Sequence, residues 1–335
     1  MTKFADTDQS VQDGPLLFGR VLDGRGGARP ISWAEAQGWK PAAPGEVLWL
    51  HLHRSHAGVG EWLQASFAIP EPTAELLTSD QTRPRGFAEQ GALVATLRDL
   101  NFNPGSVPED MISMQLWSDG SHLLTFRRAP QQSPNEVRDL LDRGAGPRDS
   151  GAMITRIVEL MIDHLSHAVV EINEAIDRLQ ADDDGTRVQE RAGQISDIRR
   201  ECLALQRHVS PQHEALEQIG RDAPAWFEMH DRREIVESIH RLRRHLDDIN
   251  ISKESALVLQ DELRACAQAT VQQATYKLGV MAGVFLPLTF LTGLLGSNVV
   301  GIPYAQEAWA FWGVVLACLV LTAIILAIFW RLRWL

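Results

Sequence analysis

The chain has 335 residues and a formal net charge of −11, from 32 Lys and Arg against 43 Asp and Glu. An acidic balance of this size argues against a nucleic-acid partner, whose backbone attracts clustered basic side chains. Cys202, Cys266 and Cys318 lie far apart and form no CxxC pair, so the sequence indicates neither a disulfide framework nor a thiolate zinc site.

The first 145 residues contain short apolar runs of strand length, separated by Gly, Pro, Asn and Asp, and these runs predict a sheet. Between the first two runs, Glu61–Ala68 and Thr73–Thr78 have the pattern of short helices. The mixture predicts a cytoplasmic α/β domain over residues 1–145. The expected strands are Glu46–His53, Gly91–Leu100, Asp110–Trp117 and His122–Arg128.

A helical period replaces the strand pattern after Gly151, where apolar residues recur every three or four positions until the run Asp182-Asp183-Asp184-Gly185. A second helix is expected from about Thr186 to His208.

A third, much longer helix is predicted after Pro224, because no Gly or Pro follows until Gly279. From Ala225 to Leu278 it would extend about 80 Å at the α-helical rise. We therefore interpret residues 146–277 as a cytoplasmic helical bundle and stalk. One apolar face recurs every seven residues, at Ile235, Leu242, Ile249, Ala256 and Leu263.

The C-terminal part of the sequence predicts two membrane spans, with two buried core helices as the alternative. Residues 278–297 form the first and contain no charged side chain, and at about 1.5 Å per residue they cover a bilayer core of about 30 Å. Residues 309–330 form the second, uncharged and bounded by Trp309 and Trp330. The predicted fold class is thus an α+β membrane protein with a cytoplasmic α/β domain, a long helical stalk and two C-terminal transmembrane helices.

Basic residues flank the spans on one side only. Lys277 precedes the first span, Arg331 and Arg333 lie in the short tail 331–335, and the connection 298–308 has no Lys or Arg. By the positive-inside rule both termini are cytoplasmic and residues 298–308 form an outer loop. We expect the chain to lie in the inner (plasma) membrane as a multi-pass protein.

The end of the first span reads Gly296-Ser297-Asn298, followed by Gly301-Ile302-Pro303. Two C-terminal spans, a giant stalk helix and a GxN at the outer mouth resemble the CorA superfamily of divalent-cation transporters, over the whole chain. Within it the sequence looks like the ZntB zinc-transporter branch, on the segments Val284–Gly296, Gly301–Pro303, Thr82–Arg85 and Trp334-Leu335.

A hairpin of two helices cannot enclose a pore, so ion passage requires several copies about an axis. The resemblance implies a homopentamer, with Gly296, Ser297 and Asn298 forming the ion-selecting mouth. The amide oxygens of Asn298 would then form a neutral ring that attracts an ion without trapping it. Its alternative role is a helix cap, which Gly and Asn often provide.

Four residues before the mouth fall roughly on one helix face and are predicted to line the pore: Gly293, Thr289, Leu286 and Leu278. The Thr289 hydroxyl could contact ion-bound water or bond its own backbone, and the leucines could act as hydrophobic gates. Glu307 is the one charged residue of the outer loop. Its copies would form a ring that concentrates cations, unless it is simply solvated.

Three groups of zinc-ligand residue types occur in the cytoplasmic part. His51 and His53 lie two apart on an expected strand, with His56 just beyond. Asp163, His164 and His167 lie within one helical turn, and Glu262 and Cys266 are four apart on the stalk. None of the three groups has a spacing that is typical of a metal site. Each group therefore consists either of surface or interface residues with ordinary hydrogen-bond partners or of ligands of a regulatory zinc ion.

The sequence has no GxxxxGK[ST], GxSxG or HExxH motif, so we predict a transporter and not an enzyme. Zinc is the expected cargo, and no tightly bound cofactor is expected. Uptake driven by membrane potential or a proton gradient is favoured. The alternatives are a magnesium channel of the same architecture, zinc efflux, and a membrane-anchored sensor or scaffold.

Overall fold

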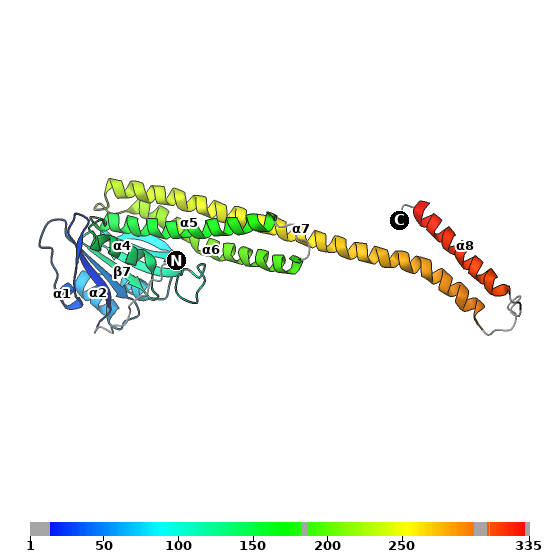
Figure 1. Ribbon diagram of the computed structural model, residues 1–335. Coiled ribbons are helices and arrows are strands. Elements are labelled where there is room, and N and C mark those ends of the chain that lie inside the picture. Colours follow the sequence, from blue (N-terminus) through cyan, green and yellow to red (C-terminus); the bar gives the residue numbers. More distant parts are fainter. Residues whose placement is uncertain (1–13, 182–186, 298–306, 308, 332–335) are drawn as a thin grey trace. The chain divides into compact units, whose positions relative to one another are not determined.

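The computed structural model describes residues 14–181, 187–297, 307 and 309–331 (Figure 1). The chain divides into two units, one that runs to Leu259 and one that begins at Gln260. Among the described residues, the first unit contains a mixed sheet, six helices and the first part of a seventh. The second contains the rest of that helix and an eighth. A sheet domain, a very long helix and two apolar C-terminal helices confirm the predicted fold class.

The sheet has seven strands in the order β2-β1-β3-β7-β6-β5-β4. Neighbouring strands pair antiparallel except β3 and β7, which pair parallel and join the two halves of the sheet. The strands are β1 (Leu16–Leu22), β2 (Ala28–Pro30), β3 (Val47–His53), β4 (Arg85–Glu89), β5 (Ala92–Asp99), β6 (Ile112–Ser118) and β7 (His122–Arg127).

The four expected strands are confirmed as β3, β5, β6 and β7, with ends within two residues of the prediction. The sequence pattern did not indicate β1, β2 or β4. Three short helices, α1 (Trp33–Ala36), α2 (Val59–Phe67) and α3 (Glu71–Thr78), cover one face of the sheet, and α2 and α3 are the two short helices that were expected.

The core of that face is apolar because β3 contributes alternate leucines to it. Leu48, Leu50 and Leu52 are almost completely buried, together with Leu63 of α2 and Leu77 of α3. Side chains at every second position of a strand point to the same face, so the intervening residues of β3 face the opposite layer.

On the opposite face lie α4 (Gln132–Asp142), α5 (Ser150–Ala181) and α6 (Val188–Asp222). The helix expected after Gly151 is confirmed as α5. The predicted end of the next helix at His208 is wrong, because α6 continues through Pro211 to Asp222. Proline removes one backbone hydrogen bond inside the helix, but burial of Leu216 and Ile219 on the far side of Pro211 keeps the helix going.

Gln212 also ties this extension of α6 to the sheet. Its Oε1 accepts a hydrogen bond from the Arg98 backbone N–H at 2.6 Å, and its Nε2 donates one to the Arg98 carbonyl at 3.0 Å. Arg98 lies in β5 beyond the end of its ladder with β4. Gln212 therefore satisfies backbone groups that no strand reaches, which offsets the bond lost at Pro211.

The predicted long helix is α7, which runs as one helix from Met229 to Leu295. The five residues of the seven-residue repeat are all buried, as the spacing predicted. Within the first unit, Ser252 of α7 donates a hydrogen bond to the Asn173 side chain of α5 at 2.6 Å.

In the second unit, the end of α7 and the whole of α8 (Ala310–Arg331) are long and apolar enough to cross a membrane. Pro287 lies inside α7 without ending it. A Cβ on Gly283 would lie 2.8 Å from the Phe329 ring, so the absence of a side chain at Gly283 allows close contact between α7 and α8.

Candidate ion pathway and metal-binding residues

The four residues predicted to line the pore lie on the exposed side of α7. Leu278 is 67% exposed and Leu286 is 67% exposed, and Thr289 and Gly293 are exposed as well. The half-buried residues of the same segment recur every three or four positions and include Gly283, which contacts α8. Leu278, Leu286, Thr289 and Gly293 are therefore on a face that α8 leaves open, as a pore-lining role requires.

Two threonines of this segment differ in their hydrogen bonding. The Thr292 hydroxyl bonds the carbonyls of Leu288 and Thr289, at 3.0 and 3.2 Å, which is the usual behaviour of threonine in a helix. The Thr289 hydroxyl has no hydrogen-bond partner in the part of the chain that the structure describes. It is thus the threonine whose hydroxyl can contact the water shell of an ion.

The C-terminal end of α7 is closed by the first two residues of the GxN. The Gly296 N–H donates to the Thr292 carbonyl at 2.8 Å, and the Ser297 hydroxyl donates to the Leu294 carbonyl at 2.8 Å. Each of these two carbonyls thus already accepts one hydrogen bond at the end of the helix. Asn298 lies outside the described residues.

Glu307 is exposed, and its backbone carbonyl accepts a hydrogen bond from the Ala310 N–H at the start of α8. Its side chain is thus presented to solvent next to the second predicted span. An exposed position is compatible with a charge ring and also with a solvated side chain that has no role in transport. The salt dependence of ion flux distinguishes these two roles.

For Glu307→Gln we expect a flux deficit that is largest at low salt and low zinc, with little change in the saturated rate. The reason is that a charge ring acts by raising the local cation concentration. The deficit should shrink as the Debye length falls from about 30 Å at about 0.01 M salt to about 8 Å at about 0.15 M. Flux into liposomes across a salt series measures this. A flux deficit that does not change with salt would mean that Glu307 coordinates the ion directly or helps to fold the loop. No flux deficit at any salt concentration would mean that Glu307 has no role in transport.

His51 lies in the middle of the sheet and is 1% exposed. His51 Nδ1 lies 2.8 Å from Thr125 Oγ1, and this hydroxyl also lies 3.3 Å from the Leu50 carbonyl oxygen. Burial, with Arg127 and Arg138 nearby, holds the pKa of His51 well below its usual value. The ring is therefore neutral and internally bonded. His53 is half-buried and pairs with Arg127 in the β3–β7 ladder.

His164 on α5 is held between two carboxylates that lie far away in the sequence. Its Nδ1 is 3.0 Å from Asp99 Oδ1, and its Nε2 is 3.1 Å from Glu136 Oε1. Burial by itself would lower the pKa of His164, but the hydrogen bonds and charges of Asp99 and Glu136 outweigh burial and raise the pKa to about 9. Ser133 completes the network by donating to Asp99 Oδ2 at 2.5 Å.

Because the pKa of His164 is raised in the folded state, the fold stabilises the charged ring. This contribution, roughly 3 kcal/mol, is complete below the unfolded pKa of 6.5 and is lost as pH rises through about 9. We expect His164→Gln to lower the unfolding temperature clearly at about pH 6 and little at about pH 10. Thermal unfolding over a pH series measures the difference. His167→Gln, at an exposed position of the same helix, is the control, and a His164 effect that is equal at all pH values would contradict the assignment.

Glu262 and Cys266 are both exposed on α7, and the Cys266 carbonyl accepts the Thr270 hydroxyl at 3.0 Å. In the residues that the structure describes, no three His, Cys, Asp or Glu side chains are grouped in a way that could hold a metal ion. The regulatory zinc sites at His51 and His53, at His164 and His167 and at Glu262 and Cys266 therefore stay predictions.

A family model described as "CorA-like Mg2+ transporter protein" matches residues 44–331, which is most of the chain. The chain belongs to this CorA-like family. It is 32% identical to the divalent cation transporter CmaX of Pseudomonas aeruginosa, over 98% of this chain and 99% of that protein. It is 30% identical to the zinc transport protein ZntB of Pectobacterium carotovorum, over 100% of both.

Solved structures agree with the family. The full-length CmaX structure superposes with a TM-score of 0.83 at 30% identity, over 97% of this chain and all of that one. The CorA magnesium transporter of Methanocaldococcus jannaschii gives a TM-score of 0.77 at 16% identity, over 95% and 99% of the two chains, which shows a shared fold. The predicted CorA resemblance, with its ZntB branch, is confirmed. This CorA-like chain is a divalent-cation transporter of the CorA/ZntB type and not an enzyme.

Proposed function

We propose that this CorA-like chain carries Zn²⁺ into the cytoplasm through an axial pore formed by five copies and lined by α7. The observation that carries the choice of zinc is the end-to-end similarity to ZntB proteins, at 29 to 30% identity over 97 to 100% of this chain. CmaX, at 32%, is named only for divalent cations. Magnesium is therefore the second candidate.

The exposed face of α7 supports the axial pore. Leu278, Leu286, Thr289 and Gly293 share a face that is not covered by α8. A single hairpin offers an ion no enclosed path, so several copies must bring these faces together around an axis. Five is the number that the family resemblance implies.

Neutral oxygens are the only polar groups that the first span and the GxN offer to an ion. Residues 278–297 carry no charged side chain, so the ion would pass the Asn298 amides and the Thr289 hydroxyls with its water shell largely retained. Such groups bind weakly enough to release the ion again, which conduction requires.

Uptake follows from the charge of the ion and the expected orientation of the spans. With Lys277 and the tail arginines on the cytoplasmic side, the GxN faces outward. A dication gains about 4.6 kcal/mol on entering a negative interior at about 100 mV. Export against this gradient would require coupling, and neither predicted span contains an Asp, Glu or His as a proton carrier.

The test is flux into liposomes that contain the purified protein, with ion-sensitive dyes inside and imposed voltage and pH gradients. We expect zinc entry that rises with inside-negative potential and exceeds magnesium entry. Faster magnesium entry would reverse the order of the two candidates, and zinc movement only against the potential with a proton gradient would mean efflux. The mass of the detergent-solubilised protein should be that of a pentamer, and a monomer or dimer that still transports would exclude the axial pore.

A further inference from the structure

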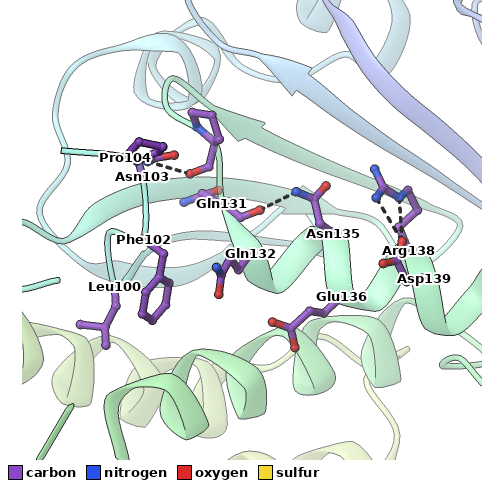
Figure 2. A pocket seen from close by; sticks show the side chains of 11 residues that line it. Leu100, Phe102, Asn103, Pro104, Gln131, Gln132, Asn135, Glu136, Arg138 and Asp139 are labelled. Carbon is purple, nitrogen blue, oxygen red and sulfur yellow. Dashed lines mark hydrogen bonds and ion pairs between the residues drawn. The ribbon is translucent and has the colours of Figure 1, made fainter. Parts of the chain in front are cut away.

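A hollow of about 390 Å³ lies on the first unit, between the loop that follows β5 and the amino-terminal half of α4. Figure 2 shows Phe102 on that loop opposite Gln132 and Glu136, which project from α4. Its size is within the range of small-molecule sites in proteins. The proposed transport function uses none of these residues.

The walls of the hollow are mainly apolar, from Leu100, Phe102, Pro104 and Pro130. Phe102 is 43% exposed although it is a large apolar side chain, and its ring meets the His164 ring edge-on with 5.3 Å between the centroids. Apolar walls and an accessible aromatic ring suit an organic molecule and not a bare metal ion, which needs oxygen, nitrogen or sulfur ligands.

Of the charged side chains that line the hollow, Glu136 and Asp139 are acidic and Arg138 is basic, and the charged His164 ring lies against Phe102. The Arg138 guanidinium is already engaged, since it bonds Asp139 and lies 5.2 Å from the centre of the Phe18 ring. Glu136 uses Oε1 to bond His164, while its Oε2 has no partner within the described part of the chain and its side chain is 42% exposed. A carboxylate oxygen without a partner, across the hollow from an aromatic ring (Figure 2), is suited to an ammonium group.

Gln131 provides a second, independent observation. This residue lines the hollow and is 2% exposed, yet neither its Nε2 nor its Oε1 has a hydrogen-bond partner among the described residues. A buried amide without partners costs about 1–3 kcal/mol. A ligand with a polar group at this end would offer the amide the hydrogen-bond partner that it lacks.

We propose that this hollow binds a small amphipathic organic cation, an amine with an apolar body. The apolar body lies against Phe102 and the two prolines, the ammonium group donates to Glu136 Oε2, and a polar group contacts the Gln131 amide. The site is separate from the ion pathway and lies entirely in the first unit.

The experiment is isothermal titration of the full-length protein in detergent with three matched probes: phenethylamine, which is a cation, 2-phenylethanol, which is neutral, and 3-phenylpropionate, which is an anion. We expect phenethylamine to bind with a Kd near or below about 1 mM and at least about tenfold more tightly than the other two. Absence of binding up to about 10 mM overturns the proposal. Equal binding of the alcohol would mean an apolar hollow without charge recognition, and preferred binding of the anion would mean that the amino end of α4 dominates; either result also overturns it.

Two variants locate the site, and a third tests the Gln131 amide. Glu136→Gln should weaken phenethylamine binding about tenfold or more, and Phe102→Ala, at an exposed position, should weaken it without unfolding the protein. Gln131→Met should leave the unfolding temperature unchanged or higher, because it removes an unpartnered buried amide. It should leave phenethylamine binding near wild type, because this probe has no second polar group. Glu174→Gln, an exposed carboxylate of α5 outside the hollow, is the charge control. Equal losses in Glu136→Gln and Glu174→Gln would show general electrostatic attraction and refute the site, whatever the transport assays give.

Discussion

Asn298→Ala is expected to reduce zinc flux at least about tenfold while the oligomer and its thermal stability stay near wild type. In the proposed pathway, the substitution removes the outer amide oxygens that attract the ion and its water shell. It should not open the helix end, because the Gly296 N–H and the Ser297 hydroxyl already bond the carbonyls of Thr292 and Leu294. Liposome flux, together with unfolding temperature and mass on the same preparation, measures both parts of the prediction.

Ser297→Ala is the matched control for that experiment. It removes the hydroxyl that bonds the Leu294 carbonyl but leaves the Asn298 amide in place. We expect a small loss of stability, about 1 kcal/mol or less, and flux close to wild type. Normal flux in Asn298→Ala would show that Asn298 is only a helix cap, and the neutral-ring mechanism would then fail.

Gly86→Ala should be the most destabilising small substitution in the sheet. A Cβ on Gly86 would lie 2.4 Å from Ile219 Cγ1 and 2.9 Å from the Ala215 carbonyl oxygen, so β4 and α6 could no longer pack at their present distance. Overpacking of this kind costs about 1–3 kcal/mol or more. A shift of α6 would also strain the two hydrogen bonds between Gln212 and the Arg98 backbone. We expect the free energy of unfolding to fall by about 3 kcal/mol and the unfolding temperature to fall by roughly 6–12 °C.

Gly60→Ala is the control for Gly86→Ala. Gly60 lies in α2, and a Cβ there would meet no atom within 4 Å. Alanine is the better helix former, so the variant should be neutral or more stable. Thermal unfolding of both proteins under the same conditions measures the contrast, and equal unfolding temperatures would mean that α6 adjusts to the added methyl group without cost.

The long, strongly patterned elements could be predicted from the sequence, whereas the weakly patterned strands could not. The seven-residue repeat of α7 and the leucine-rich runs of the sheet carry a period that burial then follows. In β4, Arg85–Glu89, the one buried residue is Gly86, so no apolar alternation marks the strand. Only its contact with α6 explains its burial, and that contact joins residues more than a hundred positions apart.

Tertiary contacts also explain the incorrect end of α6. Proline is a reasonable stop signal when the chain is considered locally. The helix continues past Pro211 because Leu216 and Ile219 are buried and because Gln212 bonds the sheet. These contacts join residues that are far apart along the chain, so no local sequence pattern indicates them.

Some features of the candidate site residues could likewise be predicted from local sequence patterns, and others depend on tertiary contacts. Leu278, Leu286, Thr289 and Gly293 could be placed on one face because helical spacing alone determines it, and the structure leaves that face open. The partners of His164 could not be found, because Asp99 is 65 positions and Glu136 is 28 positions away along the chain. His164 and His167 lie within one helical turn, yet His164 is half-buried between two carboxylates and His167 is exposed.

The single parallel ladder of the sheet has a consequence for folding kinetics. β3 and β7 join segments more than 70 residues apart, and the side chains of Trp49 and Thr125 bond across that ladder at 3.0 Å. Non-local pairing of this kind is slow, because the loop must close before the contacts form. All strands are nevertheless synthesised before the membrane spans, since β7 ends at Arg127 and the first predicted span begins at Leu278. At about 5–20 residues per second, translation of the intervening segment takes roughly ten seconds or more. The sheet thus has time to close during synthesis, before the hairpin engages the bilayer.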